Sequence, residues 1–297
     1  MAGCPAGGRF ALWSGHKHNA SVLERTGCAL RAESVRIRSD RPLANQWIVT
    51  PRPNRTAPVR LLCIPHAGGG VATFRGWSER LRAEVGIVQL PGRGSRLHDP
   101  LVQSIPDAVS GIVAELSAMP VYPTVLFGHS LGGLIAFETA RRLRDCGWPL
   151  LALFVSGRRA PRLADPLPPI SKLPVHEFMS EVQRRYDAIP AAVAADSELM
   201  NLLVPGLRAD FSMIESYRYD GGPALRCPII ACGGVDDPHA SRTELEAWRD
   251  ETSNRFSVHT FSGGHFYLQR EQEAITALIA NQLSVMVAAM TRWAGMH

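Results

Sequence analysis

A serine between two glycines is the strongest chemical signal in this chain of 297 residues. Gly128-His129-Ser130-Leu131-Gly132 has the pattern G-x-S-x-G. Residues 124–127, just before it, are suited to a buried strand, and residues 131–140, just after it, are suited to a helix. Glycines are required in a tight strand-to-helix turn because a Cβ would crowd it, and such a turn exposes the serine hydroxyl. The pattern therefore predicts that Ser130 is a nucleophile.

A serine hydroxyl reacts at neutral pH only with a base beside it and an acid that orients the base. In enzymes with this type of turn, the acid and then the histidine follow the serine along the chain. His265 follows the apolar stretch 256–261, and Asp237 follows the apolar stretch 228–232. Parallel strands would bring both to the sheet edge that carries Ser130. The sequence thus predicts a Ser130–His265–Asp237 triad.

Neighbouring residues leave some alternatives open. Asp237 lies three residues after Gly234 and before Pro238, which favours it as the acid, but Asp236 is the alternative. Either aspartate could instead only cap a turn, a common role for this residue. His66 and His129 flank the predicted site, and we expect them to shape its walls.

A tetrahedral intermediate also needs backbone donors for its oxyanion. The N–H that follows the nucleophile, that of Leu131, is the first expected donor, and that of Ala67 is the second. Ala67 belongs to a glycine-rich loop, residues 66–70, after a predicted strand at 59–65. This loop lacks the glycine spacing of phosphate-binding loops, so we do not expect a nucleotide there.

The elements that must position these residues alternate along the chain. The pattern becomes regular from residues 46–49 onward. The predicted strands cover residues 59–65, 85–90, 124–127, 150–155, 228–232 and 256–261, and the predicted helices include 74–82, 105–118 and 131–140. Apolar strands alternating with amphipathic helices predict an α/β fold with a mostly parallel central sheet covered by helices. Residues 164–220 interrupt the pattern with prolines and short helical stretches at 175–185, 197–203 and 207–216. We expect this insertion to be a lid, with a packing subdomain as the alternative.

Composition excludes several classes of protein. The net charge of +5 comes mostly from residues 1–43, so the rest of the chain is not a basic nucleic-acid binder. The cysteines show no metal-binding spacing, so no metal is expected, and they suggest a reducing, cytoplasmic location. The apolar stretch 275–290 is interrupted by polar residues and predicts a core-packing helix rather than a membrane span. Residues 1–43 resemble a disordered extension, with a transit peptide as the alternative, before one domain at 44–297.

Several stretches together resemble the type II thioesterases that accompany polyketide synthases and nonribosomal peptide synthetases. These stretches lie at residues 62–70, 89–93, 127–133, 155–161, 207–210 and 263–268, within a region of similarity over about residues 46–290. His66 stands where relatives often carry an aromatic residue, and Leu131 where many carry Met. The resemblance implies an α/β-hydrolase fold and a cofactor-free serine thioesterase. Its partners would be acyl or peptidyl carrier proteins, whose phosphopantetheine thioesters it would hydrolyse to edit stalled or misprimed synthases.

Further residues are candidates for roles that follow from this resemblance. Lid residues Phe178, Tyr186, Phe211 and Met213 could line a substrate channel or pack the lid, and Arg93, Arg158 and Arg159 could dock an acidic carrier domain or be ordinary surface arginines. We expect a monomer without nucleic-acid or membrane partners. Alternative functions are an acyl-CoA or ester hydrolase or acyltransferase with the same triad, and a non-catalytic partner of a synthase.

Overall fold

The structure is a computed structural model, and it describes residues 47–187, 189, 193 and 196–294. Nearly all of the lid region predicted at residues 164–220 falls within this part of the chain. The extension predicted at residues 1–43 lies outside the described residues.

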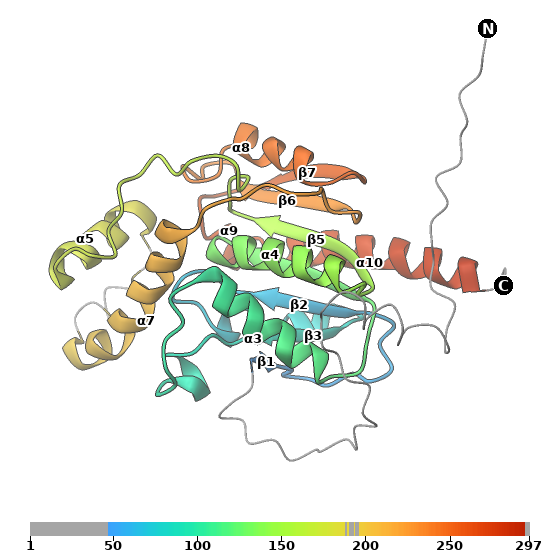
Figure 1. The fold of residues 1–297 in the computed structure, drawn as a ribbon, viewed down its shortest axis with the longest axis horizontal. Coiled ribbons are helices and arrows are strands. Elements are labelled where there is room, and N and C mark those ends of the chain that lie inside the picture. Colours follow the sequence, from blue (N-terminus) through green and yellow to red (C-terminus); the bar gives the residue numbers. More distant parts are fainter. Residues whose placement is uncertain (1–46, 188, 190–192, 194–195, 295–297) are drawn as a thin grey trace, which may run out of the picture. The chain divides into compact units, whose positions relative to one another are not determined.

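A single seven-stranded sheet forms the centre of the molecule, with the strand order β1-β3-β2-β4-β5-β6-β7 (Figure 1). The strands are β1 (Ile48–Val49), β2 (Arg60–Ile64), β3 (Glu84–Val88), β4 (Thr124–His129), β5 (Leu150–Ser156), β6 (Ile229–Gly234) and β7 (Phe256–Phe261). Only β1 is antiparallel to its neighbour, β3; the other pairs are parallel. The predicted α/β fold and its strands are confirmed.

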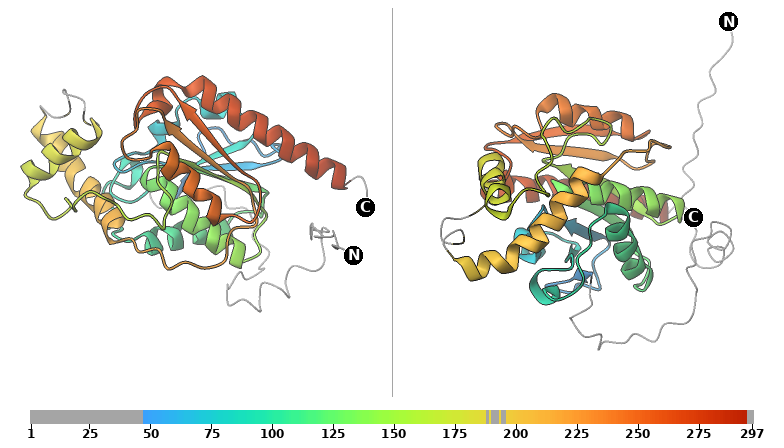
Figure 2. Two further views of the ribbon diagram at one scale, coloured as in Figure 1. Left: turned by 90° about the horizontal axis from the view of Figure 1, so that it is seen from above. Right: turned by 60° about the vertical axis from the view of Figure 1, so that its left-hand side comes forward.

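Helices cover both faces of the sheet (Figure 2). The α-helices are α2 (Trp77–Arg80), α3 (Ile105–Ser117), α4 (Leu131–Asp145), α5 (Val175–Tyr186), α7 (Ser197–Ser216), α8 (Arg242–Glu246), α9 (Tyr267–Arg270) and α10 (Gln272–Ala294), and short 3-10 helices are η2 (Val71–Phe74), η3 (Gly94–Arg96) and η4 (Ala247–Glu251). One apolar core lies between the sheet and α3, α4 and α8. A second lies between the other face and α2, α9 and α10. The central strands are buried on both faces, which explains their continuous apolar sequences.

Two helix predictions were wrong in detail. The helix expected at 74–82 is two short pieces, η2 and α2, because Gly76 between them has a φ of 83° and interrupts the helix. The two lid helices expected around Pro205 are one helix, α7. Its buried residues on both sides of Pro205, such as Val204 and Ala209, hold the helix together although proline removes one hydrogen bond.

The C-terminal helix α10 packs against the core along only part of its length. Ile275, Ile279 and Leu283 are buried in the second core, whereas Val285 is exposed. The expectation of a core-packing helix is therefore right for the first half, whereas in the second half Met286 and Val287 pack against the core only partly buried. Among the described helices, α10 is the one that is long and apolar enough to cross a membrane (residues Gln272–Arg292). The core helix of a soluble protein can have the same length and composition.

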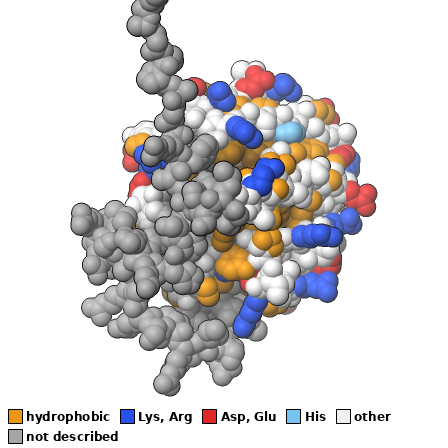
Figure 3. Space-filling model, turned by 90° about the vertical axis from the view of Figure 1, so that its right-hand side faces the viewer, with side chains coloured by type: hydrophobic (Ala, Val, Ile, Leu, Met, Phe, Trp, Pro, Cys, Tyr) orange, Lys and Arg blue, Asp and Glu red, His pale blue; other side chains and the backbone are white. Residues whose placement is uncertain are grey.

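The insertion at residues 164–220, which was predicted to be a lid and is called the lid below, connects β5 to β6 and contains α5 and α7. It lies beyond the carboxyl ends of the strands, at the left of Figure 1. It has a small apolar cluster of its own, which includes Phe178, Val182 and Phe211. The face turned away from this end carries basic and acidic side chains intermixed with apolar ones (Figure 3), so the charges visible there do not segregate by sign.

Candidate active site

Ser130 occupies a strained turn between β4 and α4. Its φ of 56° and ψ of −115° are rare for a residue with a side chain, and strain of this kind is a feature of nucleophile turns. A Cβ on Gly128 would lie 2.0 Å from the carbonyl oxygen of Gly132, and one on Gly132 would lie 2.1 Å from that of Ile64. Both glycines of the motif are therefore required by direct backbone contacts.

The structure brings the three predicted triad residues together at the carboxyl edge of the sheet. The Nε2 atom of His265 lies 2.9 Å from the Oγ atom of Ser130, and its Nδ1 atom lies 2.9 Å from Oδ2 of Asp237. All three side chains are buried. Asp236, the alternative acid, is exposed, and its N–H donates to the carbonyl of Gly263. The geometry therefore places Asp237, not Asp236, against the histidine.

His239 supports the acid, and the sequence did not single it out. Its backbone N–H donates to Oδ1 of Asp237 at 2.9 Å. Its ring stacks on Tyr186 with centroids 4.2 Å apart, and its Nε2 lies 2.8 Å from the carbonyl oxygen of Arg185 at the end of α5. His239 thus connects the lid to the acid of the triad.

The loop after β2 presents the expected oxyanion donor. Gly68 N–H donates to Oδ2 of Asp210, a buried lid residue, at 2.7 Å. The N–H of Ala67, one residue earlier, has no acceptor in the described part of the chain. Leu131 is the first residue of α4, so no intrahelical acceptor exists for its N–H. Both predicted donors are therefore available to a ligand, although their role stays a prediction.

Arg93 lies inside the molecule, which corrects its prediction as a docking residue. Its two terminal nitrogens bond both carboxylate oxygens of Asp210 at 2.7 Å, and Nη1 also donates to the carbonyl of Gly69 at 3.2 Å. Its side chain is only 10% exposed. Arg93 and Asp210 together fix the loop after β2 to helix α7. The sequence pattern 207–210 had marked Asp210 as part of the resemblance but had suggested no role.

Arg158 and Arg159 are also poorly placed for docking. The side chain of Arg159 is 7% exposed and pairs with Glu244 at 3.2 Å. The side chain of Arg158 is 13% exposed, and burial lowers the pKa of its guanidinium. The prediction that Arg158 and Arg159 dock an acidic carrier domain is therefore wrong, because the loop after β5 turns both side chains inward.

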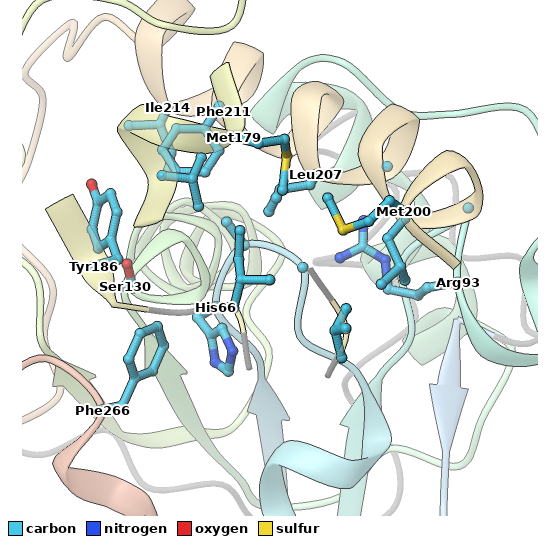
Figure 4. A pocket seen from close by; sticks show the side chains of 18 of the residues that line it. His66, Arg93, Ser130, Met179, Tyr186, Met200, Leu207, Phe211, Ile214 and Phe266 are labelled. Carbon is cyan, nitrogen blue, oxygen red and sulfur yellow. The ribbon is translucent and has the colours of Figure 1, made fainter. Parts of the chain in front are cut away.

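A cavity of about 220 Å³ begins at Ser130 and runs beneath the lid (Figure 4). Apolar lid side chains form most of its wall, and Tyr186 stands next to Ser130. The lining side chains from the lid include Met179, Val182, Tyr186, Met200, Leu203, Leu207, Phe211 and Ile214. Tyr186 and Phe211 therefore line the space as predicted. Phe178 and Met213 do not: Phe178 packs edge-on against Phe211 inside the lid, and Met213 is buried in the first core.

Two further histidines lie near the triad. His66 lines the cavity as expected, and burial together with the charges of His265 and Arg93 lowers its pKa to about 4. His129 is buried below the site, where Nδ1 lies 2.8 Å from the Ser156 hydroxyl. Burial lowers the pKa of His129 well below its usual value. Both rings are therefore neutral at neutral pH and add no charge beside His265.

The described residues contain no group of three or more His, Cys, Asp or Glu side chains arranged to hold a metal ion. The chemistry the arrangement can perform is nucleophilic attack by Ser130 on an acyl group, with a neighbouring base and oxyanion donors.

The fold and site together define an α/β-hydrolase, in which a serine on a strained strand–helix turn is followed by an acid and a histidine. The thioesterase domain family matches residues 59–283. The chain is 36% identical to the gramicidin S biosynthesis protein GrsT of Aneurinibacillus migulanus, over 82% of this chain and 96% of that protein. It is 38% identical to the thioesterase PikA5 of Streptomyces venezuelae, over 83% of this chain and 90% of that protein.

A solved structure of the type II thioesterase BorB, from the borrelidin biosynthetic cluster, matches with a TM-score of 0.74 and 38% identity, over 80% of this chain and 97% of that one. The chain belongs to the thioesterase family and is a thioester hydrolase. The family resemblance predicted from the sequence is confirmed.

Proposed function

We propose that this thioesterase hydrolyses acyl or aminoacyl thioesters on the phosphopantetheine arm of carrier proteins, and so clears stalled or misprimed synthases. The supporting observation is the position of Ser130, which opens into an apolar cavity covered by the lid. Such a space suits an acyl chain, because burying apolar surface contributes about 25 cal/mol per Å². The relatives named above come from biosynthetic systems of this kind, which supports the same context here.

The first half of the reaction transfers the acyl group to the enzyme. His265 Nε2 accepts the Ser130 proton as Oγ attacks the thioester carbonyl, and Asp237 stabilises the imidazolium. The N–H groups of Ala67 and Leu131 hold the oxyanion. When the tetrahedral intermediate collapses, the carbon–sulfur bond breaks and His265 returns the proton to the leaving thiolate.

The second half releases the acid. His265 removes a proton from water, whose oxygen attacks the acyl-Ser130 ester. The bond between the acyl carbon and Oγ then breaks, and Oγ takes the proton from His265. Ser130, His265 and Asp237 all come from one chain, so we propose that a monomer is competent and that it acts in the cytoplasm with its synthase.

Comparison of three substrates with one acyl group tests the proposal: an acyl-carrier-protein thioester, the acyl-CoA and the p-nitrophenyl ester. We expect kcat/KM for the carrier thioester to exceed that for the ester by at least about tenfold, which corresponds to about 1.4 kcal/mol of transition-state binding. Ser130→Ala is the control for background hydrolysis. A preference for the simple ester would contradict the proposal and favour a general ester hydrolase.

A further inference from the structure

A second, smaller space also touches Ser130 and His265. Its volume is about 10 Å³, and most of its lining residues are absent from the apolar cavity. Apart from Ser130, Tyr186 and His265, which line both spaces, its walls come from the loops after β5 and β6: Gly157, Arg158, Arg159, Asp165 and His239. We call this space the polar chamber. It lies beside the reacting serine and the base.

The polar chamber has the size and chemistry of a site for one water molecule. A volume of about 10–15 Å³ accommodates one water when two to four polar groups surround it. Arg158 Nε is buried and has no hydrogen-bond partner among the described residues. Nη1 of Arg158 lies 4.0 Å from Oδ2 of Asp165, too far for a direct hydrogen bond but suited to a bridging water.

A larger space lies next to the polar chamber. Its volume is about 500 Å³, and Arg158, Asp165 and Tyr186 line both it and the polar chamber. Arg162, Arg185 and Glu215 are among its other charged walls, and Phe211 and Ile214 line both this space and the acyl cavity. Because Arg158 and Asp165 line both spaces, water that fills the larger space lies next to the polar chamber, which Ser130 and His265 also line.

We propose that the polar chamber holds the hydrolytic water, and that Arg158 and Asp165 are the positioning residues that orient it. This inference rests on the acyl-Ser130 intermediate of the proposed function. The water oxygen forms a bond to the acyl carbon, His265 Nε2 takes one water proton, and the ester bond to Oγ breaks as Oγ receives that proton. A reserved water explains why such a site hydrolyses its acyl-enzyme rather than passing the acyl group to another alcohol or amine.

The two half-reactions can be measured separately with a p-nitrophenyl ester, because nitrophenol release reports acylation and the following steady state reports deacylation. In Arg158→Met and Asp165→Asn we expect the deacylation rate to fall about tenfold or more and the acylation rate to stay within about twofold. Acyl-Ser130 then accumulates and is visible by intact-protein mass spectrometry. Arg242→Met, at an exposed arginine on α8, is the matched control and should change neither rate.

Equal loss of acylation and deacylation in both variants would overturn the inference, as would unchanged rates. A variant that does not fold is replaced by a second measurement on the wild-type protein. A crystal structure at a resolution that shows ordered water should reveal one water within hydrogen-bond reach of Arg158 and His265, and an empty or apolar-filled chamber would contradict us. Because the test uses a simple ester, it does not depend on the proposed carrier substrate. A protein with no preference for carrier thioesters would still show slower deacylation with unchanged acylation in these variants.

Discussion

Asp210 of the lid helix α7 accepts a hydrogen bond from the backbone N–H of Gly68 at 2.7 Å, directly beside the predicted oxyanion donor Ala67. The same carboxylate forms a bidentate pair with Arg93, which also bonds the carbonyl of Gly69. Three segments far apart in the sequence therefore meet at one carboxylate. The position of the loop that carries Ala67, the predicted oxyanion donor, therefore depends on where helix α7 lies.

Removal of one partner of this pair should damage catalysis more than substrate binding. In Asp210→Asn we expect kcat to fall about 10- to 100-fold with a smaller change in KM, because a displaced oxyanion donor weakens only transition-state contacts. The free energy of unfolding should decrease by about 3–5 kcal/mol, since Arg93 is left buried and unpaired. Steady-state kinetics and urea unfolding measure the two effects.

The double variant Arg93→Met/Asp210→Leu separates the two effects. Removing both charges should restore much of the lost stability, because no unpaired charge stays buried. It should not restore kcat, because no side chain then holds the loop at Gly68. Recovery of both quantities together would show that the pair acts only on folding.

The two neighbouring aspartates should differ sharply when each is changed to asparagine. Asp237→Asn removes the carboxylate that lies 2.9 Å from His265 Nδ1, and we expect kcat to fall about 10⁴-fold, as in other triads. Asp236→Asn alters an exposed side chain and should stay within about threefold of the wild type. A large loss from Asp236→Asn, with little from Asp237→Asn, would reverse the assignment.

His66 should make the protein less stable as the pH falls below about 6.5, its unfolded pKa. Burial, with the charges of His265 and Arg93, lowers its folded pKa to about 4. Between these two values the unfolded chain binds a proton that the folded chain does not, so stability decreases as the pH falls. At pH 5 this contributes a loss of roughly 2 kcal/mol relative to pH 7.

His66→Phe should therefore reduce the difference in unfolding free energy between pH 7 and pH 5 by roughly 2 kcal/mol. Urea unfolding at both pH values measures this difference. His176→Phe is a suitable control because that side chain is 83% exposed. If His66→Phe and the wild type lose the same stability on acidification, then His66 is not buried in its neutral form.

The far wall of the acyl cavity should set the chain length that fits. Met200 lies across the cavity from Ser130 (Figure 4), so Met200→Trp should shorten the available space. We expect at least about a tenfold lower kcat/KM for an octanoyl thioester and about twofold or less change for an acetyl thioester. Leu202→Trp, at a side chain on α7 that is 51% exposed, is the control. Equal effects of Met200→Trp on both substrates would place the acyl chain elsewhere.

Much of this site was predictable because its chemistry depends on local patterns. The residues Ser130, Asp237 and His265 follow apolar strands, and the carboxyl ends of parallel strands meet at one edge. The spacing of Gly128 and Gly132 around Ser130 was enough to predict the turn.

Contacts between distant segments could not be predicted in the same way. Arginine and aspartate are usually exposed, so nothing local indicated that Arg93 and Asp210 are buried together, 117 residues apart. Phe178 and Phe211 occupy the same lid cluster, and only packing decides that Phe211 also reaches the cavity. His239 was overlooked because its contribution to Asp237 comes from a backbone N–H, which every non-proline residue has.

Direct detection of the acyl-enzyme is the most decisive measurement. The protein is mixed with a carrier protein that bears an acyl-phosphopantetheine thioester, quenched in acid within milliseconds and digested for mass spectrometry. We predict that the acyl mass appears on the peptide containing Ser130, and that Ser130→Ala shows neither this adduct nor hydrolysis above about one part in a thousand of the wild-type rate. Release of the free acid by Ser130→Ala at the wild-type rate would contradict the account.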